Sequence, residues 1–202
     1  MFRLIKIVFN ACFLVLAIIG FNAIGGQKYV ESAKNAIVNF VQERAMENAK
    51  KVGDFSGIHE EFQIDNTVSL LGYKAVIAEH DASGQKMCII DSGTKALLTQ
   101  ADIQGPNLEK KLNELVDKFK HQSISFQEIK ITSRGNIDIY GKTAPYAKFE
   151  AKSNKLPFSD ISGIVSSVKT SDGSEKIAIS VNERKRYSQL ISEEFFKDVK
   201  EN

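Results

Sequence analysis

Cysteine is scarce in this sequence, which has two residues of this type, Cys12 and Cys88, among 202. Cys12 lies in an apolar stretch near the amino terminus, so Cys88 is alone in the rest of the chain. An intrachain disulfide between them is therefore not expected. For both cysteines the expected role is apolar packing, Cys12 in a membrane helix and Cys88 in a sheet.

A large excess of one charge is also missing. The chain has 27 Lys and Arg against 25 Asp and Glu, and Arg3 and Lys6 near the amino terminus account for the difference. The densest basic run is "ERKR", residues 183–186, which is expected to form a solvated turn. Proteins that bind phosphate backbones concentrate basic side chains on one surface. We therefore predict no nucleic-acid partner.

Metal-binding motifs are absent from the sequence. The histidines His59, His80 and His121 are scattered, and none has a partner at the spacing of metal ligands. The segment "HEEF" at His59 begins like the zinc-protease helix motif, but Gln63 occupies the place of the second histidine. We expect no metal site, and we expect surface or turn positions for the histidines.

Motifs for nucleophilic catalysis or phosphate binding are missing as well. In "DSG", residues 91–93, Ile90 replaces the first glycine of the nucleophile elbow G-x-S-x-G. The expected role of "DSGT" is to end a strand and cap a short helix over residues 95–98. Cys88 lies between Met87 and Ile89 without an evident thiolate-stabilising setting. The sequence thus predicts no catalytic residue, no cofactor and a non-enzymatic function.

An uncharged segment, residues 7–27, follows a short basic lead-in. At about 1.5 Å per residue a helix of this length reaches roughly 30 Å, the thickness of the bilayer's hydrocarbon core. The segment is expected to be a permanent membrane anchor. The alternative is a signal peptide cut after Gly25, since Ala23, Ile24 and Gly25 form a small-x-small pattern.

The basic residues on either side of the segment indicate its orientation. Arg3 and Lys6 precede it, and Lys28 and Lys34 follow it. The slight bias favours a cytoplasmic tail and an exported domain. The expected location is therefore the cell membrane, as a single-pass protein with its globular domain on the extracytoplasmic side.

A helical pattern continues beyond the uncharged segment. Residues 28–53 are expected to form an amphipathic stalk that ends at Gly53. Its apolar stripe must be covered by the globular domain, by a second copy or by the bilayer surface, and packing on the domain is expected. The stripe consists of small and large apolar residues: Val30, Ala33, Ile37, Phe40, Val41, Ala45 and Ala49.

The remaining residues, 54–202, are expected to form one globular domain. A hairpin is predicted from residues 72–80 and 85–91 across "DASG", and another from 163–170 and 175–182 across "SDGS". Between them, "SISFQEIKIT" and "NIDIY" are expected as two strands flanking "SRG", followed by a strand over 146–151. Strands linked this closely indicate an antiparallel sheet.

Two longer helices are expected beside these strands. One follows Gly105 and Pro106, and the other has Ser188 as its N-cap. The fold class is therefore α+β, with helices packed on an antiparallel sheet as an α/β/α sandwich. The first helix is expected to line one face with Leu108, Leu112, Leu115, Val116 and Phe119, and the second to bury Leu190, Ile191, Phe195 and Val199.

The globular part of the chain resembles a known family, and the segments that carry the resemblance lie near its carboxyl end. The order of "PYAKFEA", "GIVSSVKTSDGSEKIAISVN" and "YSQLISEEFFKDV" is similar to the end of PsbP-like α/β/α domains, in which a hairpin leads into a final helix with paired aromatics such as Phe195 and Phe196. The resemblance covers about residues 55–199 and transfers no catalytic or binding residue. It implies an accessory or ligand-holding module, often exported and membrane-associated, although a helical spine before the domain departs from that pattern.

Two function classes remain open at this point. The first is a membrane-tethered extracytoplasmic binding or scaffold module, with the membrane contacted through residues 7–27 and a protein or small-molecule partner of unknown identity. The second is a pilin-like assembly subunit, but the acidic residue expected in a mature pilin helix is missing from residues 1–27. A secreted soluble domain would result if the first segment were cleaved. The tether is the expected function, and the oligomeric state is left open.

Overall fold

The computed structural model describes residues 47–70, 73–91, 93, 96–117, 126–153 and 160–202. The expected anchor 7–27, with Cys12, and most of the expected stalk 28–53 lie outside these residues, as do His121 and Phe119. Within the described ranges, no helix combines the length and apolar character needed to cross a membrane.

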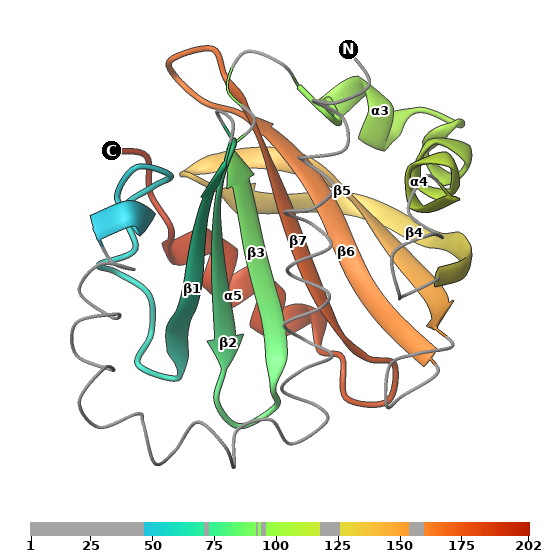
Figure 1. The fold of residues 1–202 in the computed structure, drawn as a ribbon, viewed down its shortest axis with the longest axis horizontal. Coiled ribbons are helices and arrows are strands. Elements are labelled where there is room, and N and C mark those ends of the chain that lie inside the picture. Colours follow the sequence, from blue (N-terminus) through green and yellow to red (C-terminus); the bar gives the residue numbers. More distant parts are fainter. Residues whose placement is uncertain (1–46, 71–72, 92, 94–95, 118–125, 154–159) are drawn as a thin grey trace.

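A seven-stranded antiparallel sheet organises the described chain (Figure 1). The strands lie in the order β1-β2-β3-β7-β6-β5-β4, so β1 and β4 form the two edges. The strands are β1 (Phe62–Leu70), β2 (Tyr73–His80), β3 (Gln85–Asp91), β4 (Phe126–Ile139), β5 (Lys142–Ser153), β6 (Asp160–Lys169) and β7 (Glu175–Glu183). The helices are α3 (Gln100–Gln104), α4 (Leu108–Asp117) and α5 (Gln189–Asp198). The α+β class with an antiparallel sheet is confirmed.

Both predicted hairpins are confirmed. Strands β2 and β3 close with His80 opposite Gln85, and strands β6 and β7 close with Lys169 opposite Glu175. Strand β3 lies between β2 and β7, and nearly all its side chains are buried. The strand that carries Cys88 is therefore interior to the sheet, as apolar residues on both of its faces predicted.

The prediction of two strands flanking "SRG" was wrong. Strand β4 runs through this tripeptide without a break, and the chain reverses later, at Tyr140 and Gly141, which have φ values of 56° and 68°. Positive φ at both central residues is typical of the tight hairpin turn. Gly135 permits close approach of β5, because a Cβ atom there would lie 2.8 Å from the Tyr146 ring. Glycine here serves packing against the neighbouring strand and does not mark a turn.

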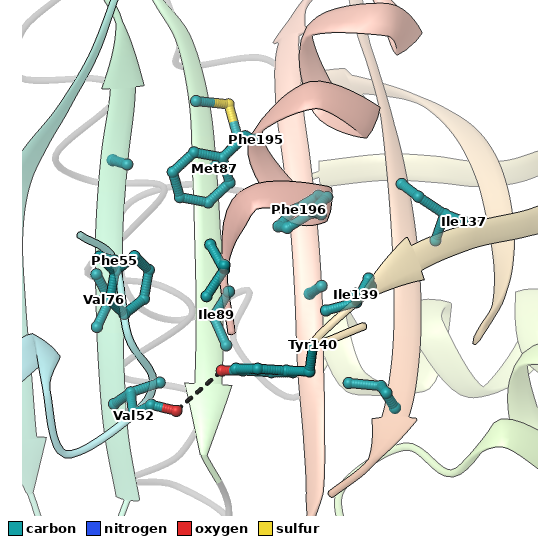
Figure 2. Close-up of a cluster of buried hydrophobic side chains, with 14 of the residues drawn as sticks. Val52, Phe55, Val76, Met87, Ile89, Ile137, Ile139, Tyr140, Phe195 and Phe196 are labelled. Atoms are coloured by element: carbon teal, nitrogen blue, oxygen red, sulfur yellow. Dashed lines mark hydrogen bonds between the residues drawn. The ribbon is translucent and has the colours of Figure 1, made fainter. Parts of the chain in front are cut away.

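Side chains alternate between the two faces of the sheet and form two cores. The first core contains Met87 of β3 and the paired Phe195 and Phe196 of α5 (Figure 2). The second core contains Cys88 of β3 and Ile103 of α3. Helix α5 thus packs on one face of the sheet, while α3 and α4 pack on the opposite face over β4, β5 and β6.

The short helix expected over residues 95–98 lies elsewhere. Residues 96–98 are not helical, and α3 begins two positions later, at Gln100. Thr99 is its N-cap: the Thr99 hydroxyl accepts a bond from the Asp102 amide, and the Asp102 carboxylate accepts one from the Thr99 amide. This reciprocal capping box explains why the helix begins after Thr99.

The two longer helices agree with the predicted positions except in details. Helix α4 begins at Leu108, which is buried, and Leu112 is partly buried beside it. In α5, Ser188 is the N-cap residue, but its side chain forms no capping bond. Burial of Leu190 was wrongly predicted: this side chain is 75% exposed, and Phe196 is buried instead. The buried side chains of α5 therefore lie closer to the carboxyl-terminal end of the helix than predicted.

The described chain begins with a segment that is fastened to the sheet. Ala49 and Val52 belong to the first core. The Val52 carbonyl accepts a hydrogen bond from the Tyr140 hydroxyl at 2.9 Å (Figure 2). It accepts another from the Lys176 ammonium, which also lies 4.9 Å from the centre of the Tyr140 ring. Burial raises the pKa of Tyr140 and lowers that of Lys176. We call these contacts the Val52 clamp. The division into stalk and domain at residue 53 stays a prediction.

Candidate functional site

An ionic pocket of about 190 Å³ lies where β4, β5, β6 and the end of β7 meet. The register of the sheet brings its residues together, with Lys130 opposite Glu150 and Lys152 opposite Asp160. Two apolar side chains form part of its wall. The lining residues are Glu128, Lys130, Glu150, Ala151, Lys152, Asp160, Ile161 and Arg184.

Charges of both signs line this pocket in equal number. Arg184 Nη2 lies 3.1 Å from Glu150 Oε1, and Lys130 Nζ lies 3.6 Å from Glu128 Oε2. Both members of the second pair are about 70% exposed, and the Arg184 side chain is 57% exposed. Exposed ion pairs contribute about 0–1 kcal/mol to stability. These pairs can therefore exchange partners at small cost, which suits recognition.

The backbone at the rim of the pocket is unusual. Glu128 has a φ of 50°, in the left-handed region that residues other than glycine seldom occupy. It lies in the irregularity between Gln127 and Lys130, where β4 contains more residues than the facing stretch of β5. A bulge of this kind turns a side chain away from its regular direction. The bulge therefore sets where the Glu128 carboxylate stands at the rim.

The histidine segment forms a structural contact. His80 is buried; its Nδ1 lies 3.0 Å from the Ser83 hydroxyl and its Nε2 lies 3.3 Å from Glu61 Oε2. The exposed His59 lies 3.9 Å from the same carboxylate oxygen. The "HEEF" segment leads into β1 and not into a helix. Over the described ranges, no group of three possible metal ligands is found.

The other candidates for chemistry are tied to local structure. In "DSG", the Asp91 carboxylate accepts a 2.8 Å hydrogen bond from the Gly93 amide and so closes a turn. Cys88 is buried in the second core with 1% of its surface exposed. The "ERKR" run contains a turn over residues 184–186, as predicted, and the first residue of this turn, Arg184, also lines the pocket.

Sequence reasoning did not find the ionic pocket. Its charged residues come from four separate strands or strand ends and have no shared spacing. Alternating charges on strands are ordinary for a solvated sheet face, so no local signal distinguishes Lys130 or Glu150 from other surface residues. The pocket becomes visible only once the register is known.

The fold and the pocket define an α+β protein whose open antiparallel sheet carries helices on both faces and an ionic hollow at one end. No family model matches the chain, and the search of curated proteins finds no match. Among solved structures, the chain is similar to cyanobacterial PsbP (CyanoP) from Synechocystis sp. PCC 6803, with 14% identity over 70% of this chain and 92% of that chain and a TM-score of 0.33. This likeness is a weak one of architecture, and neither a residue nor a ligand is carried over from it.

Proposed function

We propose that the protein is a non-enzymatic binding or scaffold module that is held at the cell membrane by residues 7–27. The observation that carries the binding role is the ionic pocket, which is lined by three carboxylate side chains and three positively charged side chains. Its globular domain stands on the extracytoplasmic side. This proposal keeps the orientation expected from the basic residues around the uncharged segment.

The size and charge of the pocket favour a macromolecular partner. Pockets that enclose drug-sized ligands have volumes of about 300–1,000 Å³. A volume of about 190 Å³ fits one or two side chains of a larger surface instead. Because both charges are present, the matching surface carries adjacent acidic and basic side chains. The expected partner is a protein segment of mixed charge.

Crosslinking in intact membranes tests the binding role. A photoreactive amino acid at Lys152, in the pocket, should give a salt-sensitive adduct, and Arg184→Glu should weaken it. The matched control is the same amino acid at Lys110, an exposed position on α4. Equal adducts at both positions, or an adduct at Lys152 that is insensitive to salt and to Arg184→Glu, would contradict this role.

The tether has its own test. The native protein should fractionate with membranes, and its intact mass should include residues 1–27. A mass that corresponds to a chain starting at Gly26 would replace the anchor with a cleaved signal peptide and make the protein a secreted domain. Detergent-extracted protein should sediment as a small species; a sedimenting filament would favour a pilin-like subunit.

A further inference from the structure

Strand β4 is the longest strand described and forms one edge of the open sheet. An edge strand presents a row of peptide N–H and C=O groups that can pair with a strand of another molecule. The question is therefore how the outward groups of β4 are satisfied.

Side chains of α4 form hydrogen bonds with these backbone groups. The Asn113 amide donates from Nδ2 to the Ile129 carbonyl at 2.9 Å, and its Oδ1 accepts from the Ile129 amide at 3.0 Å. Two positions further along β4, the Ile131 amide donates to Glu109 Oε2 at 3.0 Å. Asn113 Nδ2 also donates to the Glu109 carbonyl within the helix, which holds the side-chain amide in place.

This arrangement imitates a neighbouring strand. In an antiparallel ladder, a residue of a hydrogen-bonded pair uses both its N–H and its C=O toward the same neighbour, and the next such residue is two positions away. Ile129 and Ile131 have this spacing, and the Asn113 side chain supplies the donor and the acceptor that a peptide group would supply. Asn113 and Glu109 therefore block the positions that an added strand would need.

We propose that α4 is a removable guard, and that the edge it covers pairs with β4 of a second copy of this chain when the guard is lost. The outward donor and acceptor of Ile129 are self-complementary, so two copies can pair antiparallel about a two-fold axis through this residue. Such pairing sets Glu128 of each copy beside Lys130 of the other, which places opposite charges together. The irregularities in β4 oppose flat pairing, so the dimer is reversible.

The attachment of α4 is suited to release. Among its described side chains, Leu108 is buried and Leu112 is partly buried, whereas Lys110 and Glu114 are exposed and pair with each other. Beyond these contacts, Lys111 Nζ lies 2.6 Å from Asp102 of α3. A helix of ten residues that packs beside an edge strand opens at lower cost than the sheet on which it rests.

The test uses the full chain in detergent and measures its mass by sedimentation over a range of concentrations. The guard variant carries Asn113→Leu and Glu109→Ala, which remove the strand-like contacts with good helix formers. It should form dimers at concentrations where the wild type is monomeric, and the Ile129 and Ile131 amides should exchange more slowly as concentration rises. The control variant carries Lys110→Ala and Glu114→Ala on the same helix and should stay monomeric.

Charge reversal at the edge separates pairing from general aggregation. In the guard variant, Lys130→Glu sets like charges together and should weaken the dimer by about tenfold, and adding Glu128→Lys should restore it. Phe196→Leu, which loosens the opposite face of the sheet, should stay monomeric. The proposal is overturned if the guard variant keeps its fold and stays monomeric, if its association ignores Lys130→Glu, or if Phe196→Leu associates equally.

Discussion

The Val52 clamp predicts that the domain needs the residues before Phe55 for its full stability. A chain that starts at Phe55 loses Ala49 and Val52 from the first core, and it leaves the buried Tyr140 hydroxyl and Lys176 without the Val52 carbonyl. Burial of a valine side chain is worth about 1.5–3 kcal/mol. A buried hydroxyl without a partner costs about 1–3 kcal/mol. We therefore expect the chain that starts at Phe55 to be less stable by about 3–6 kcal/mol, against a total of about 5–15 kcal/mol for a typical domain.

The measurement is chemical denaturation of residues 55–202 and 47–202 in parallel. The longer chain keeps the whole clamp and should unfold cooperatively at a clearly higher denaturant concentration. Two substitutions in the longer chain separate the contributions. Tyr140→Phe should cost only about 1 kcal/mol, because the Val52 carbonyl keeps its bond from Lys176.

Gly53→Ala should disrupt the clamp without removing any residue. Its Cβ atom would lie 2.8 Å from the Tyr140 ring and 3.0 Å from the Lys200 carbonyl, so the segment would have to move. We expect a loss of about 1–3 kcal/mol, as in other overpacked sites. Coincident unfolding midpoints for the chains that start at 47 and 55 would refute this reasoning and show that the clamp does not stabilise the domain.

Three other outcomes follow from buried or bonded side chains. Gln85→Ala should lower the free energy of unfolding by about 2–4 kcal/mol in denaturation experiments, since Gln85 is buried and bonds both to the Ser188 backbone and to the Ser192 hydroxyl of α5. Cys88 should react slowly with iodoacetamide in the native state and rapidly in denaturant, and Cys88→Ser should cost about 1–3 kcal/mol, more than Cys88→Ala; fast native labelling with loss of binding would contradict a packing role. Hydrogen bonds from Thr170 and Ser174 lower the pKa of Asp172 below 3.8. The wild type should therefore be more stable than Asp172→Asn above about pH 4, and this difference in stability should disappear as the pH falls further. A stability difference that persists at low pH in parallel acid titrations would refute this.

Much of the sheet could be predicted because its signals are local. The hairpin turns contain Asp, Ser and Gly between apolar strands, and these residues favour tight reversal wherever the strands end up. The interior position of β3 follows from apolar groups on both of its faces, which only a strand covered on both sides can bury. The capping signal misled the prediction: "DSGT" was expected to cap a helix over residues 95–98, but the reciprocal bonds between Thr99 and Asp102 start the helix after Thr99.

The continuity of β4 could not be predicted because it depends on contacts with other elements. "SRG" carries an ordinary turn signal, but the Arg134 side chain donates to the carbonyls of Ile103 and Gly105, and Gly135 makes room for the Tyr146 ring. The Arg134 contacts come from α3 and its end, about 30 positions earlier, and the Gly135 contact comes from the neighbouring strand β5. Tertiary contacts therefore outweigh the local preference at this point.

The pocket and the guard both depend on the register of β4, which local patterns leave open. Asn113 and Ile129 lie 16 positions apart, and their pairing needs the outward groups of Ile129 to face α4. A slip by one residue would turn these groups toward β5 and move every side chain to the other face. The irregularity at Glu128 lies between the residues that pair with β5 on either side and so helps to set the register. A change that removes it is therefore expected to disturb the ionic pocket and the guard together, although the two sites use different groups of the strand.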